Sequence, residues 1–233
     1  MNQAPDFLRC LYADDDLLVL DKPSGLLCVP GRGPDKQDCL SARAASRWAD
    51  ALVVHRLDQA TSGLVLMARN PPGQRRLSQD FAERRVHKRY AAVVHGRPPA
   101  KDCGLLAPAS ETASACGPEP GWHCIDLPIA ADWERRPLRI IDAERGKPSQ
   151  TLWRTMEQMS PDRTRVELQP LTGRTHQLRL HLAAIGHPIL GDALYAPPQV
   201  QQAATRLLLH AQALEFAHPA TGAWMRFEAA ADF

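Results

Sequence analysis

Three ionisable residues interrupt an apolar stretch in the first half of the chain. In the segment ALVVHRLDQATSGLVLMARN, residues 51–70, the side chains of His55, Arg56 and Asp58 lie between two apolar runs. A carboxylate in a rigid, partly desolvated loop can act as a nucleophile or a base when a cation keeps it ionised. Asp58 is therefore the first candidate for a reactive group. The alternative is a structural aspartate that caps a turn or pairs with Arg56.

The residues around Asp58 and a second motif supply what such a group needs. Thr61 and Ser62 follow Asp58 directly, and their hydroxyls and amides are of the kind that hold a loop or a phosphate in place. The motif GRTHQLRLH, residues 173–181, contains Arg174 and Arg179, and either guanidinium can balance a buried carboxylate. The two motifs together predict a site built on Asp58 and a distant arginine.

Other kinds of catalytic site find little support in the sequence. Neither a G-x-G-x-x-G pattern, a Walker A motif nor the G-x-S-x-G turn of a serine hydrolase is present. His176 and His181 are five positions apart, which does not place them on one helical face as a zinc-binding H-E-x-x-H helix requires. We expect no metal and no cofactor, and a metal-dependent hydrolase that uses these two histidines remains a minor alternative.

The cysteines predict neither a disulfide framework nor a zinc site. No two of them form a C-x-x-C pair, and their spacings are irregular. Reduced thiols are therefore expected at all six positions: Cys10, Cys28, Cys39, Cys103, Cys116 and Cys124.

Basic residues are concentrated in one segment although the formal net charge of the chain is only +2. Residues 74–90 contain six of them: Arg75, Arg76, Arg84, Arg85, Lys88 and Arg89. Together with the basic residues of 173–181, this segment makes a polyanionic partner a reasonable expectation. A solvated helix face explains each of these arginines equally well when it is taken alone.

The elements that must position these residues can be predicted from hydrophobic periodicity and turn signals. Helices are expected over 38–50, with Asp38 as the N-cap, over 72–85, and over 175–186 up to Gly186. Strands flank the polar loop within 51–70, and a strand, a Pro-Ser-Gly turn and a second extended piece occupy 17–31. Further strands are expected over 88–96, 138–144, 149–159, 163–171, 207–218 and 223–230.

The predicted strands outnumber the helices and come in hairpins, without a regular alternation of strand and helix. We therefore expect an α+β fold: one domain over 1–233, with a mixed, mostly antiparallel central sheet flanked by helices and loops. An irregular insertion is expected at about 100–123, where Pro, Ala, Gly and Ser dominate. No apolar segment approaches the ~20 residues of a membrane span, so a cytoplasmic protein without membrane contact is expected.

Five segments, which follow one another along the chain in the order of the family, resemble the RluA-type pseudouridine synthases. HRLDQATSGLVL resembles the family signature whose aspartate is catalytic, and KRYAAVVHG resembles the segment that carries the active-site tyrosine, here Tyr90. The other three segments are LLVLDKPSGLLCVPG, LTGRTHQLRLHLAAIGHPILGDALY and RLLLHAQALEFAHP. Within the family the chain is similar to the compact, dual-specificity members that act on rRNA and tRNA and lack an N-terminal S4 domain. The Pro/Gly-rich stretch over 105–123 is longer than in those members.

This resemblance implies an isomerase that converts uridines of structured RNA, either 23S rRNA or a tRNA anticodon stem-loop, into pseudouridine. Asp58, Tyr90 and Arg179 are the implied catalytic residues: Asp58 reacts, Arg179 keeps it ionised, and Tyr90 stacks on the uracil. Arg56 is implied to fill the space of the flipped base. Further RNA-binding candidates are His55, Thr61, Ser62, Arg174, His176, Gln177, Leu178, Arg75, Arg76, Arg84 and Arg85.

RNA is the only partner that we expect, and the protein is expected to act as a monomer without a protein partner. A noncatalytic RNA-folding chaperone on the same scaffold is the alternative. The residues do not specify the RNA, the uridine, or the route of the Asp58 chemistry.

Overall fold

The computed structural model describes residues 8–98 and 121–233, which form two compact units. The first unit comprises the residues up to Lys88 and His210–Asp232, and the second comprises Arg89–Leu209 with Phe233. Most of the insertion predicted at 100–123 lies outside the described residues. The single domain over 1–233 remains a prediction.

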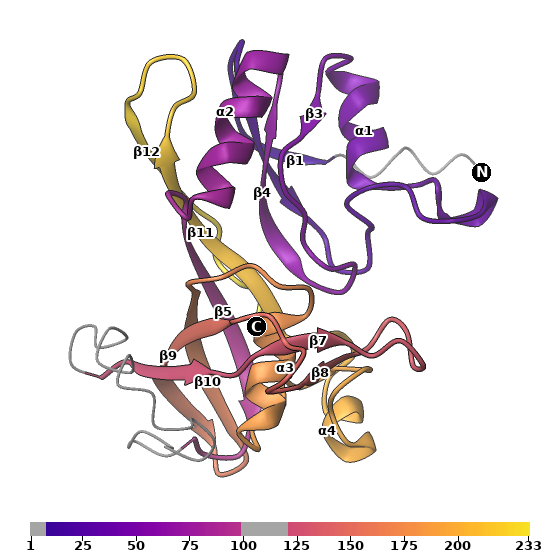
Figure 1. The fold of residues 1–233 in the computed structure, drawn as a ribbon, viewed down its shortest axis with the longest axis vertical. Helices are drawn as coiled ribbons and strands as arrows, with labels where there is room; N and C mark the ends of the chain where they lie inside the picture. Colours follow the sequence, from indigo (N-terminus) through magenta and orange to yellow (C-terminus); the bar gives the residue numbers. More distant parts are fainter. Residues whose placement is uncertain (1–7, 99–120) are drawn as a thin grey trace. The chain divides into compact units, whose positions relative to one another are not determined.

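The first unit is built around β2 (Leu17–Lys22) and β4 (Ser62–Ala68), which pair in antiparallel fashion (Figure 1). The register joins Leu17 with Ala68 and Lys22 with Gly63. The first strand β1 pairs with β2, and the two-residue β3 pairs with β4. On its other side β4 pairs in parallel with β11, which in turn pairs with β12. The bounds of these strands are β1 (Arg9–Ala13), β3 (Leu52–Val53), β11 (Leu209–Ala217) and β12 (Trp224–Glu228).

The core of the first unit lies against β4, all seven residues of which are buried. Such a continuous apolar run is typical of a strand that is covered on both faces. The helix α2 (Pro71–Ala82) contacts β4 and contributes Leu77 to the core, and Figure 1 shows it alongside this strand. The other members of this core are Leu17, Val19, Leu64, Leu66, Ala68, Val86, Leu214, Phe216 and Ala229.

Three local predictions for the first unit were wrong in detail. The strand that leads into the Asp58 loop is only the half-buried β3, because the chain turns into the polar loop almost at once. The N-cap of the helix α1 (Leu40–Arg47) is Cys39 and not Asp38. The Asp38 carboxylate instead pairs with Arg43 at 2.7 Å. The extended piece expected between the Pro-Ser-Gly turn and Gly31 is a loop with an isolated bridge from Leu27 to Cys39, and the 3-10 turn η1 (Pro34–Lys36) follows it. The helix α2 begins at Pro71, directly after its cap Asn70, whose side chain accepts a hydrogen bond from the Gly73 amide, and it ends at Ala82.

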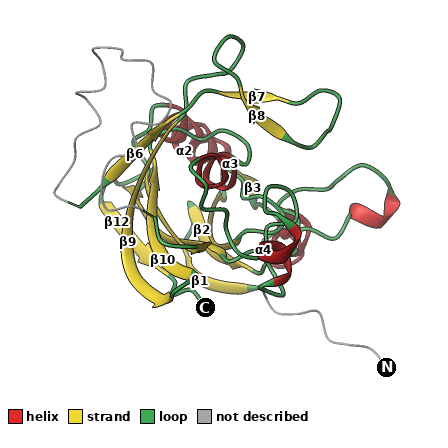
Figure 2. Ribbon diagram, turned by 90° about the horizontal axis from the view of Figure 1, so that it is seen from below, coloured by secondary structure: helices red, strands yellow, loops and turns green. Residues whose placement is uncertain are grey.

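The second unit contains an antiparallel set of strands in the order β5-β10-β9-β6. The hairpin β9–β10 confirms the strands predicted over 149–159 and 163–171, and the residues of β5 from Arg89 on belong to this unit. A separate hairpin joins β7 and β8 (Figure 2). The bounds are β5 (His87–His95), β6 (His123–Asp126), β7 (Ile129–Ala131), β8 (Arg139–Ile141), β9 (Gln150–Ser160) and β10 (Arg163–Pro170).

Two helices complete the second unit. The helix α3 (Gln177–Ala184) confirms the prediction at its carboxyl end, since Gly186 has a φ of 86° and donates its amide to the carbonyl of Ala183. The short α4 (Pro198–Gln202) was not predicted, because its Pro- and Gln-rich segment has little apolar periodicity. The mixed, mostly antiparallel arrangement with helices confirms the α+β class. No helix within 8–98 or 121–233 is long and apolar enough to cross a membrane.

Candidate active site

The loop that carries Asp58 is held by a buried lysine. Lys22 is fully buried at the end of β2, and its ammonium donates to three carbonyl oxygens. These belong to Pro23 at 2.9 Å, Leu26 at 2.8 Å and Gln59 at 3.0 Å. Burial lowers the pKa of Lys22 to about 8, and the nearby carboxylate of Asp58 opposes this shift. The sequence prediction missed Lys22; the signal that could have found it is its place between a buried strand and a Pro-Ser-Gly turn.

The Pro-Ser-Gly turn after Lys22 adds further contacts to the same loop. The Gly25 amide donates to the Gln59 carbonyl at 2.9 Å, and the Gln59 side chain donates back to the Gly25 carbonyl at 3.0 Å. Ser24 Oγ donates to the carbonyl of Ala60 at 2.7 Å. The two residues that follow Asp58 are therefore fixed to the β2 turn through backbone atoms.

The backbone is also fixed on both sides of Asp58. The amide of Leu57 donates to Cys28 Sγ at 3.2 Å, and the amide of Thr61 donates to the Asp58 carbonyl at 3.1 Å. Burial raises the pKa of the Cys28 thiol, which suits a neutral acceptor in this position. Asp58 itself is half-buried. A rigid loop with a partly desolvated carboxylate is the arrangement that a positioned reagent requires.

The start of β4 fixes the far end of the loop. Ser62 Oγ lies 2.9 Å from His210 Nδ1, and His210 Nε2 lies 3.1 Å from the Ala229 carbonyl. Since a carbonyl only accepts, His210 carries its proton on Nε2 and Ser62 donates to Nδ1. Thr61 and Ser62 are both buried, so the structure places them as supports of the Asp58 loop.

His55 and Arg56, although adjacent, have different environments. His55 Nε2 accepts a hydrogen bond from the Leu66 amide at 2.9 Å, and its ring stacks on Phe81 with centroids 4.2 Å apart. Burial and the nearby charge of Lys88 lower the pKa of His55 to about 3, so the ring is neutral. Arg56, in contrast, is exposed to solvent. His55 thus supports the loop, and Arg56 is available to a ligand.

In the second unit, Arg179 forms a buried ion pair with Asp192. Its Nε and Nη2 atoms donate to the two carboxylate oxygens at 2.8 and 2.6 Å, and the side chains are 4% and 0% exposed. The Asp192 carboxylate also accepts from the amides of Leu194 and Tyr195 at 2.8 and 3.2 Å. The ring of Tyr195 lies 5.4 Å from the guanidinium carbon. The sequence did not single out Asp192 and Tyr195, although both lie in residues 171–195, one of the segments that resemble the family.

The turn before α3 is held by side chains of the same motif. His176 adopts a left-handed conformation with φ 58°, and its Nδ1 lies 2.8 Å from Tyr195 Oη, which accepts from the Arg139 amide. Gln177 is 3% exposed and uses both ends of its amide: it donates to Gln150 O and accepts from the Arg174 amide. Gln177 therefore supports the turn. Leu178 is buried as well, at 7% exposure.

The metal-hydrolase alternative finds no support at His181. Its Nδ1 lies 2.9 Å from Thr151 Oγ1 and its Nε2 lies 3.0 Å from the Leu127 carbonyl, so both ring nitrogens have partners. Burial lowers the pKa of His181 to about 4. The neutral ring is thus a structural part of the second unit.

The three candidate catalytic residues lie in different units. Asp58 belongs to the first unit, whereas Tyr90 and Arg179 belong to the second. Tyr90 is half-buried on β5, opposite Leu168 of β10. The joint action of the three remains a prediction.

The arginines expected to bind RNA differ in their charge balance. Arg76 and Arg85 both pair with Asp80, at 3.4 and 2.5 Å, and Arg85 also pairs with Glu83. Arg75 and Arg84 are exposed and form no ion pair with another described residue. Arg174 is exposed and donates to the Pro148 carbonyl at 3.4 Å. Arg75, Arg84 and Arg174 are thus better suited to phosphates than Arg76 and Arg85.

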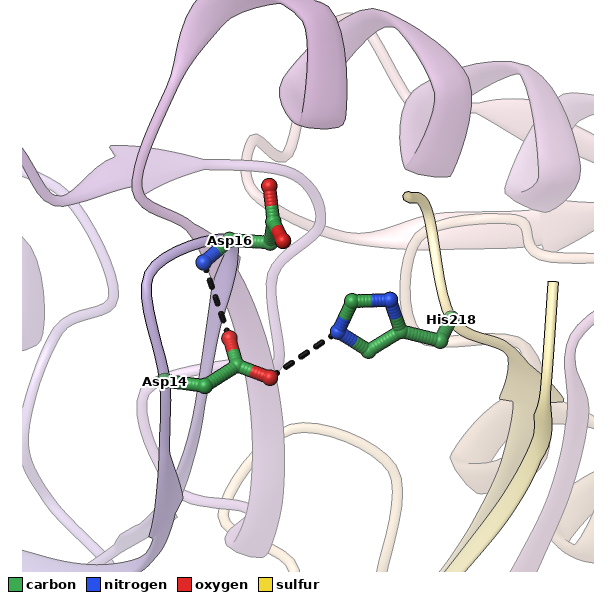
Figure 3. A group of neighbouring side chains, drawn as sticks. All are labelled: Asp14, Asp16 and His218. Carbon is green, nitrogen blue, oxygen red and sulfur yellow. Dashed lines mark hydrogen bonds and ion pairs between the residues drawn. The ribbon is translucent and has the colours of Figure 1, made fainter. Parts of the chain in front are cut away.

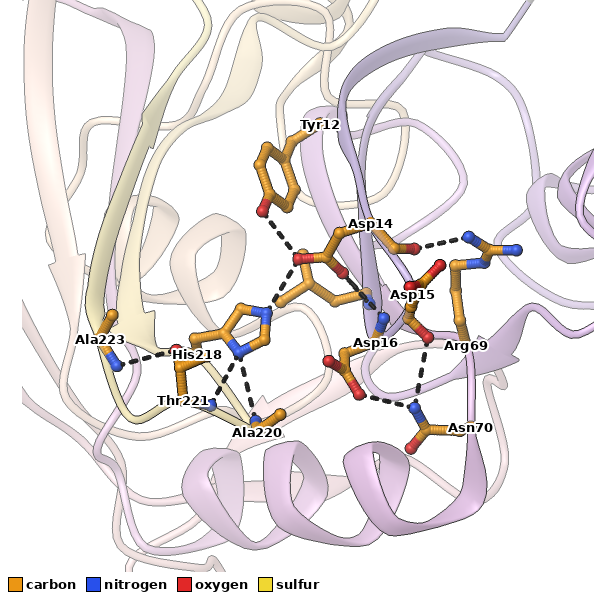
Figure 4. A network of polar contacts seen from close by, with 11 residues as sticks. Tyr12, Asp14, Asp15, Asp16, Arg69, Asn70, His218, Ala220, Thr221 and Ala223 are labelled. Atoms are coloured by element: carbon orange, nitrogen blue, oxygen red, sulfur yellow. Dashed lines mark hydrogen bonds and ion pairs between the residues drawn. The ribbon is translucent and has the colours of Figure 1, made fainter.

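A group of potential metal ligands, Asp14, Asp16 and His218, lies elsewhere in the first unit (Figure 3). The Asp14 carboxylate accepts four hydrogen bonds, and Figure 4 shows those from Tyr12, Asp16 and His218. Its donors are Tyr12 Oη, His218 Nε2 and the amides of Asp16 and Leu17. His218 Nδ1 accepts from the amides of Ala220 and Thr221, so Nε2 carries the proton. The group therefore connects the β1–β2 turn to the turn after β11.

Comparison with known proteins adds independent information. The model of the RNA pseudouridylate synthase family matches residues 16–184. The dual-specificity RNA pseudouridine synthase RluA of Escherichia coli K12 is 42% identical over 227 residues, which cover 97% of this chain and 94% of that protein. The protein of the same name from Pasteurella multocida is 42% identical over 223 residues, covering 96% of this chain and 93% of that protein.

Solved structures share the fold. Human RNA pseudouridylate synthase domain containing 1 superposes with a TM-score of 0.74 at 26% identity, covering 99% of this chain and 86% of that chain. Human RNA pseudouridylate synthase domain containing 4 gives a TM-score of 0.69 at 22% identity, covering 95% of this chain and 88% of that chain. At 22% identity, the similarity to the domain containing 4 protein shows a shared fold and nothing more.

Proposed function

Because the chain belongs to the RNA pseudouridylate synthase family, we propose that it flips single uridines out of structured RNA and isomerises them through Asp58. The protein is an isomerase of the RluA type that converts uridine to pseudouridine. One observation carries the proposal for Asp58. The carbonyl oxygens of the next two residues, Gln59 and Ala60, accept hydrogen bonds from Lys22, Ser24 and Gly25, which fixes the loop.

The reaction breaks the glycosidic bond between C1′ and N1, turns the uracil, and forms a bond between C1′ and C5. The proton on C5 is then lost and N1 gains one, so the product is an isomer of the substrate. Asp58 serves this sequence as a nucleophile on C1′ or C6 or as a base on the ribose. The half-buried position of Asp58 favours such a role, since an ionised carboxylate becomes more reactive as water is removed.

Arg179 is proposed to pair with Asp58 and keep it ionised. A guanidinium has five N–H donors, and the bidentate pair with Asp192 uses two of them. Asp192 and the ring of Tyr195 hold the orientation of Arg179. Tyr90 is proposed to stack on the flipped uracil and to assist removal of the C5 proton.

The exposed Arg56 is proposed to occupy the space that the uridine leaves in the RNA stack. Arg75, Arg84 and Arg174 hold phosphates, with weaker contributions from Arg76 and Arg85 because their charges are balanced by acids. The remaining candidates are proposed to support these groups: His55, Thr61, Ser62, His176, Gln177 and Leu178.

The substrate is proposed to be a stem-loop of 23S rRNA, of a tRNA anticodon arm, or both. The support is the name of the relatives, dual-specificity RNA pseudouridine synthase, together with the coverage of nearly their whole length. Bases in such loops are already partly unstacked, which reduces the free energy needed to flip them. Catalysis by a monomer in the cytoplasm, without a protein partner or cofactor, completes the proposal.

The test is turnover on defined RNA. The purified protein is incubated with a tRNA anticodon stem-loop and with fragments of 23S rRNA, and pseudouridine is mapped by carbodiimide labelling and primer extension. Pseudouridine at discrete positions in at least one RNA is the expected result. RNA binding without any pseudouridine in either RNA would support the chaperone alternative and contradict the proposal.

A further inference from the structure

The hairpin β7–β8 of the second unit presents an exposed tryptophan at its turn. Trp133 is 71% exposed, the largest exposed fraction among the bulky apolar side chains that the structure describes. The guanidinium carbon of Arg136 lies 4.1 Å from the centroid of the Trp133 ring. An exposed aromatic ring with an arginine beside it is the kind of group on which proteins stack unpaired nucleobases.

The turn that presents Trp133 is held in one shape. The Asp132 carboxylate accepts from the Arg135 amide at 3.0 Å and from Arg135 Nε at 2.8 Å. The amide of Asp132 donates to the Leu138 carbonyl, and the amide of Leu138 donates to the Arg135 carbonyl. Trp133 therefore projects from a closed turn, so little conformational entropy is lost when a ligand stacks on it.

The same hairpin is anchored to the candidate active site. The Arg139 amide, at the start of β8, donates to Tyr195 Oη at 2.9 Å. Tyr195 contacts both His176 and Arg179. Figure 1 shows the hairpin beside α3, the helix that carries Arg179, and the contacts between α3 and β8 agree. The position of Trp133 is thus linked to that of Arg179 within one unit.

We propose that Trp133 and Arg136 form a stacking platform for an unpaired base of the substrate RNA, outside the pocket of the flipped uridine. Any nucleobase can stack on the indole, and Arg136 adds a positive charge for the adjacent phosphate. Arg135 is also exposed beside them, although it pairs with Asp132. The occupant is RNA rather than an apolar protein surface because the ring is flanked by guanidinium groups. This inference rests on the proposed function and assigns a further contact to it.

The test compares Trp133→Ala with Trp224→Ala, in which a second exposed tryptophan, 57% exposed and in the other unit, is removed. Binding to a fluorescently labelled RNA stem-loop and kcat/KM for pseudouridine formation are measured for both. Trp133→Ala should weaken binding by at least about five-fold, the effect of one lost stacking contact, and Trp133→Phe should restore most of it. Trp224→Ala should change neither quantity by more than about two-fold.

A second pair of variants separates the charge from the ring. Arg136→Ala should lower RNA affinity at low salt, whereas Arg145→Ala should have little effect, because Arg145 is neutralised by Asp142 at 2.8 Å. Circular dichroism and thermal unfolding check that the folds are intact.

Equal RNA affinity of Trp133→Ala and the wild type would overturn the platform, while pseudouridine formation by the wild type would leave the proposed function intact. Loss of self-association in Trp133→Ala, measured by sedimentation, with unchanged RNA affinity would show a protein interface instead.

Discussion

The ammonium of Lys22 donates a hydrogen bond to the carbonyl oxygen of Gln59 at 3.0 Å, across 37 positions of the chain. Gln59 follows Asp58, so this contact fixes the backbone next to the proposed reagent. Lys22 has no exposed surface, and its other two donors are taken by Pro23 and Leu26. A lysine in this setting stabilises the loop because its three N–H groups satisfy three carbonyl oxygens that would otherwise lack a donor.

Lys22→Ala is expected to lower the free energy of unfolding by several kcal/mol, because each buried acceptor left without a donor costs about 1–3 kcal/mol. Pseudouridine formation should fall further than stability explains, since the Asp58 loop loses its anchor. Urea unfolding monitored by tryptophan fluorescence gives the stability, and Lys147→Ala, at an exposed lysine, is the matched control. Equal unfolding midpoints for the two variants would contradict this role of Lys22.

Asp58→Asn is expected to reduce pseudouridine formation to the background of the uncatalysed reaction, because the amide is neither a nucleophile nor a base. The loop should keep its shape, since its anchors are backbone atoms and the side chains of Lys22 and Ser24. RNA affinity, measured by filter binding, should stay within about three-fold of the wild type if phosphate contacts dominate it. Turnover by this variant at a rate near that of the wild type would refute the assignment.

Gly63→Ala should destabilise the first unit severely. Gly63 has a φ of 109°, and a Cβ atom there would lie 2.4 Å from the Ala211 carbonyl oxygen on the neighbouring strand β11. Gly222→Ala is the control, because Gly222 has a φ of 72° and open space around it, so only the backbone strain of about 1 kcal/mol applies. Thermal unfolding should show a much larger loss for Gly63→Ala, and similar losses would argue against the close approach of β4 and β11.

Asp192→Ala should lower the free energy of unfolding by about 3–5 kcal/mol, because it leaves the buried charge of Arg179 without its partner. Asp38→Ala breaks the pair with Arg43, in which the Asp38 side chain is 64% exposed, and should lose less than about 1 kcal/mol. Chemical denaturation of both variants tests the contrast. If Asp192→Ala lowered the free energy of unfolding as little as Asp38→Ala does, the buried charge of Arg179 would not depend on Asp192.

The stability of the fold should decrease below neutral pH. The pKa of His181 is lowered by burial to about 4, so the unfolded chain binds a proton that the folded chain does not between this value and the ordinary His pKa of about 6.5. Stability due to the neutral ring is present above about pH 6.5 and is lost as the pH falls toward 4.

His181→Gln should reduce the slope of unfolding free energy against pH in this window, by up to about 1.4 kcal/mol per pH unit. Urea unfolding at intervals between pH 4 and 7 measures it. His187→Gln serves as the control, because His187 is half-buried whereas the ring of His181 is fully buried. An unchanged slope in His181→Gln would show that this ring takes up a proton in the folded state.

Local patterns in the sequence were sufficient for most of the elements. The apolar run of β4, the hairpin β9–β10 and the end of α3 at Gly186 follow from periodicity and turn chemistry, which act over a few residues. Asp58 was a candidate because of its position in a polar loop between two apolar runs, and the family resemblance, which the comparisons confirm, supplied the reaction.

The partners of these residues depend on which distant segments become neighbours, and no local pattern encodes that. Lys22 reads as an ordinary surface lysine until the loop after β3 brings the Gln59 carbonyl to its ammonium. Arg179 acquires Asp192, which lies beyond the end of α3, because the chain folds back after Gly186. The sequence by itself determined most of the strands and helices and the proposal of Asp58 as the reactive group. Only the tertiary structure decided the hydrogen bonds and ion pairs that hold the loop and the arginine, since a buried polar group requires a partner.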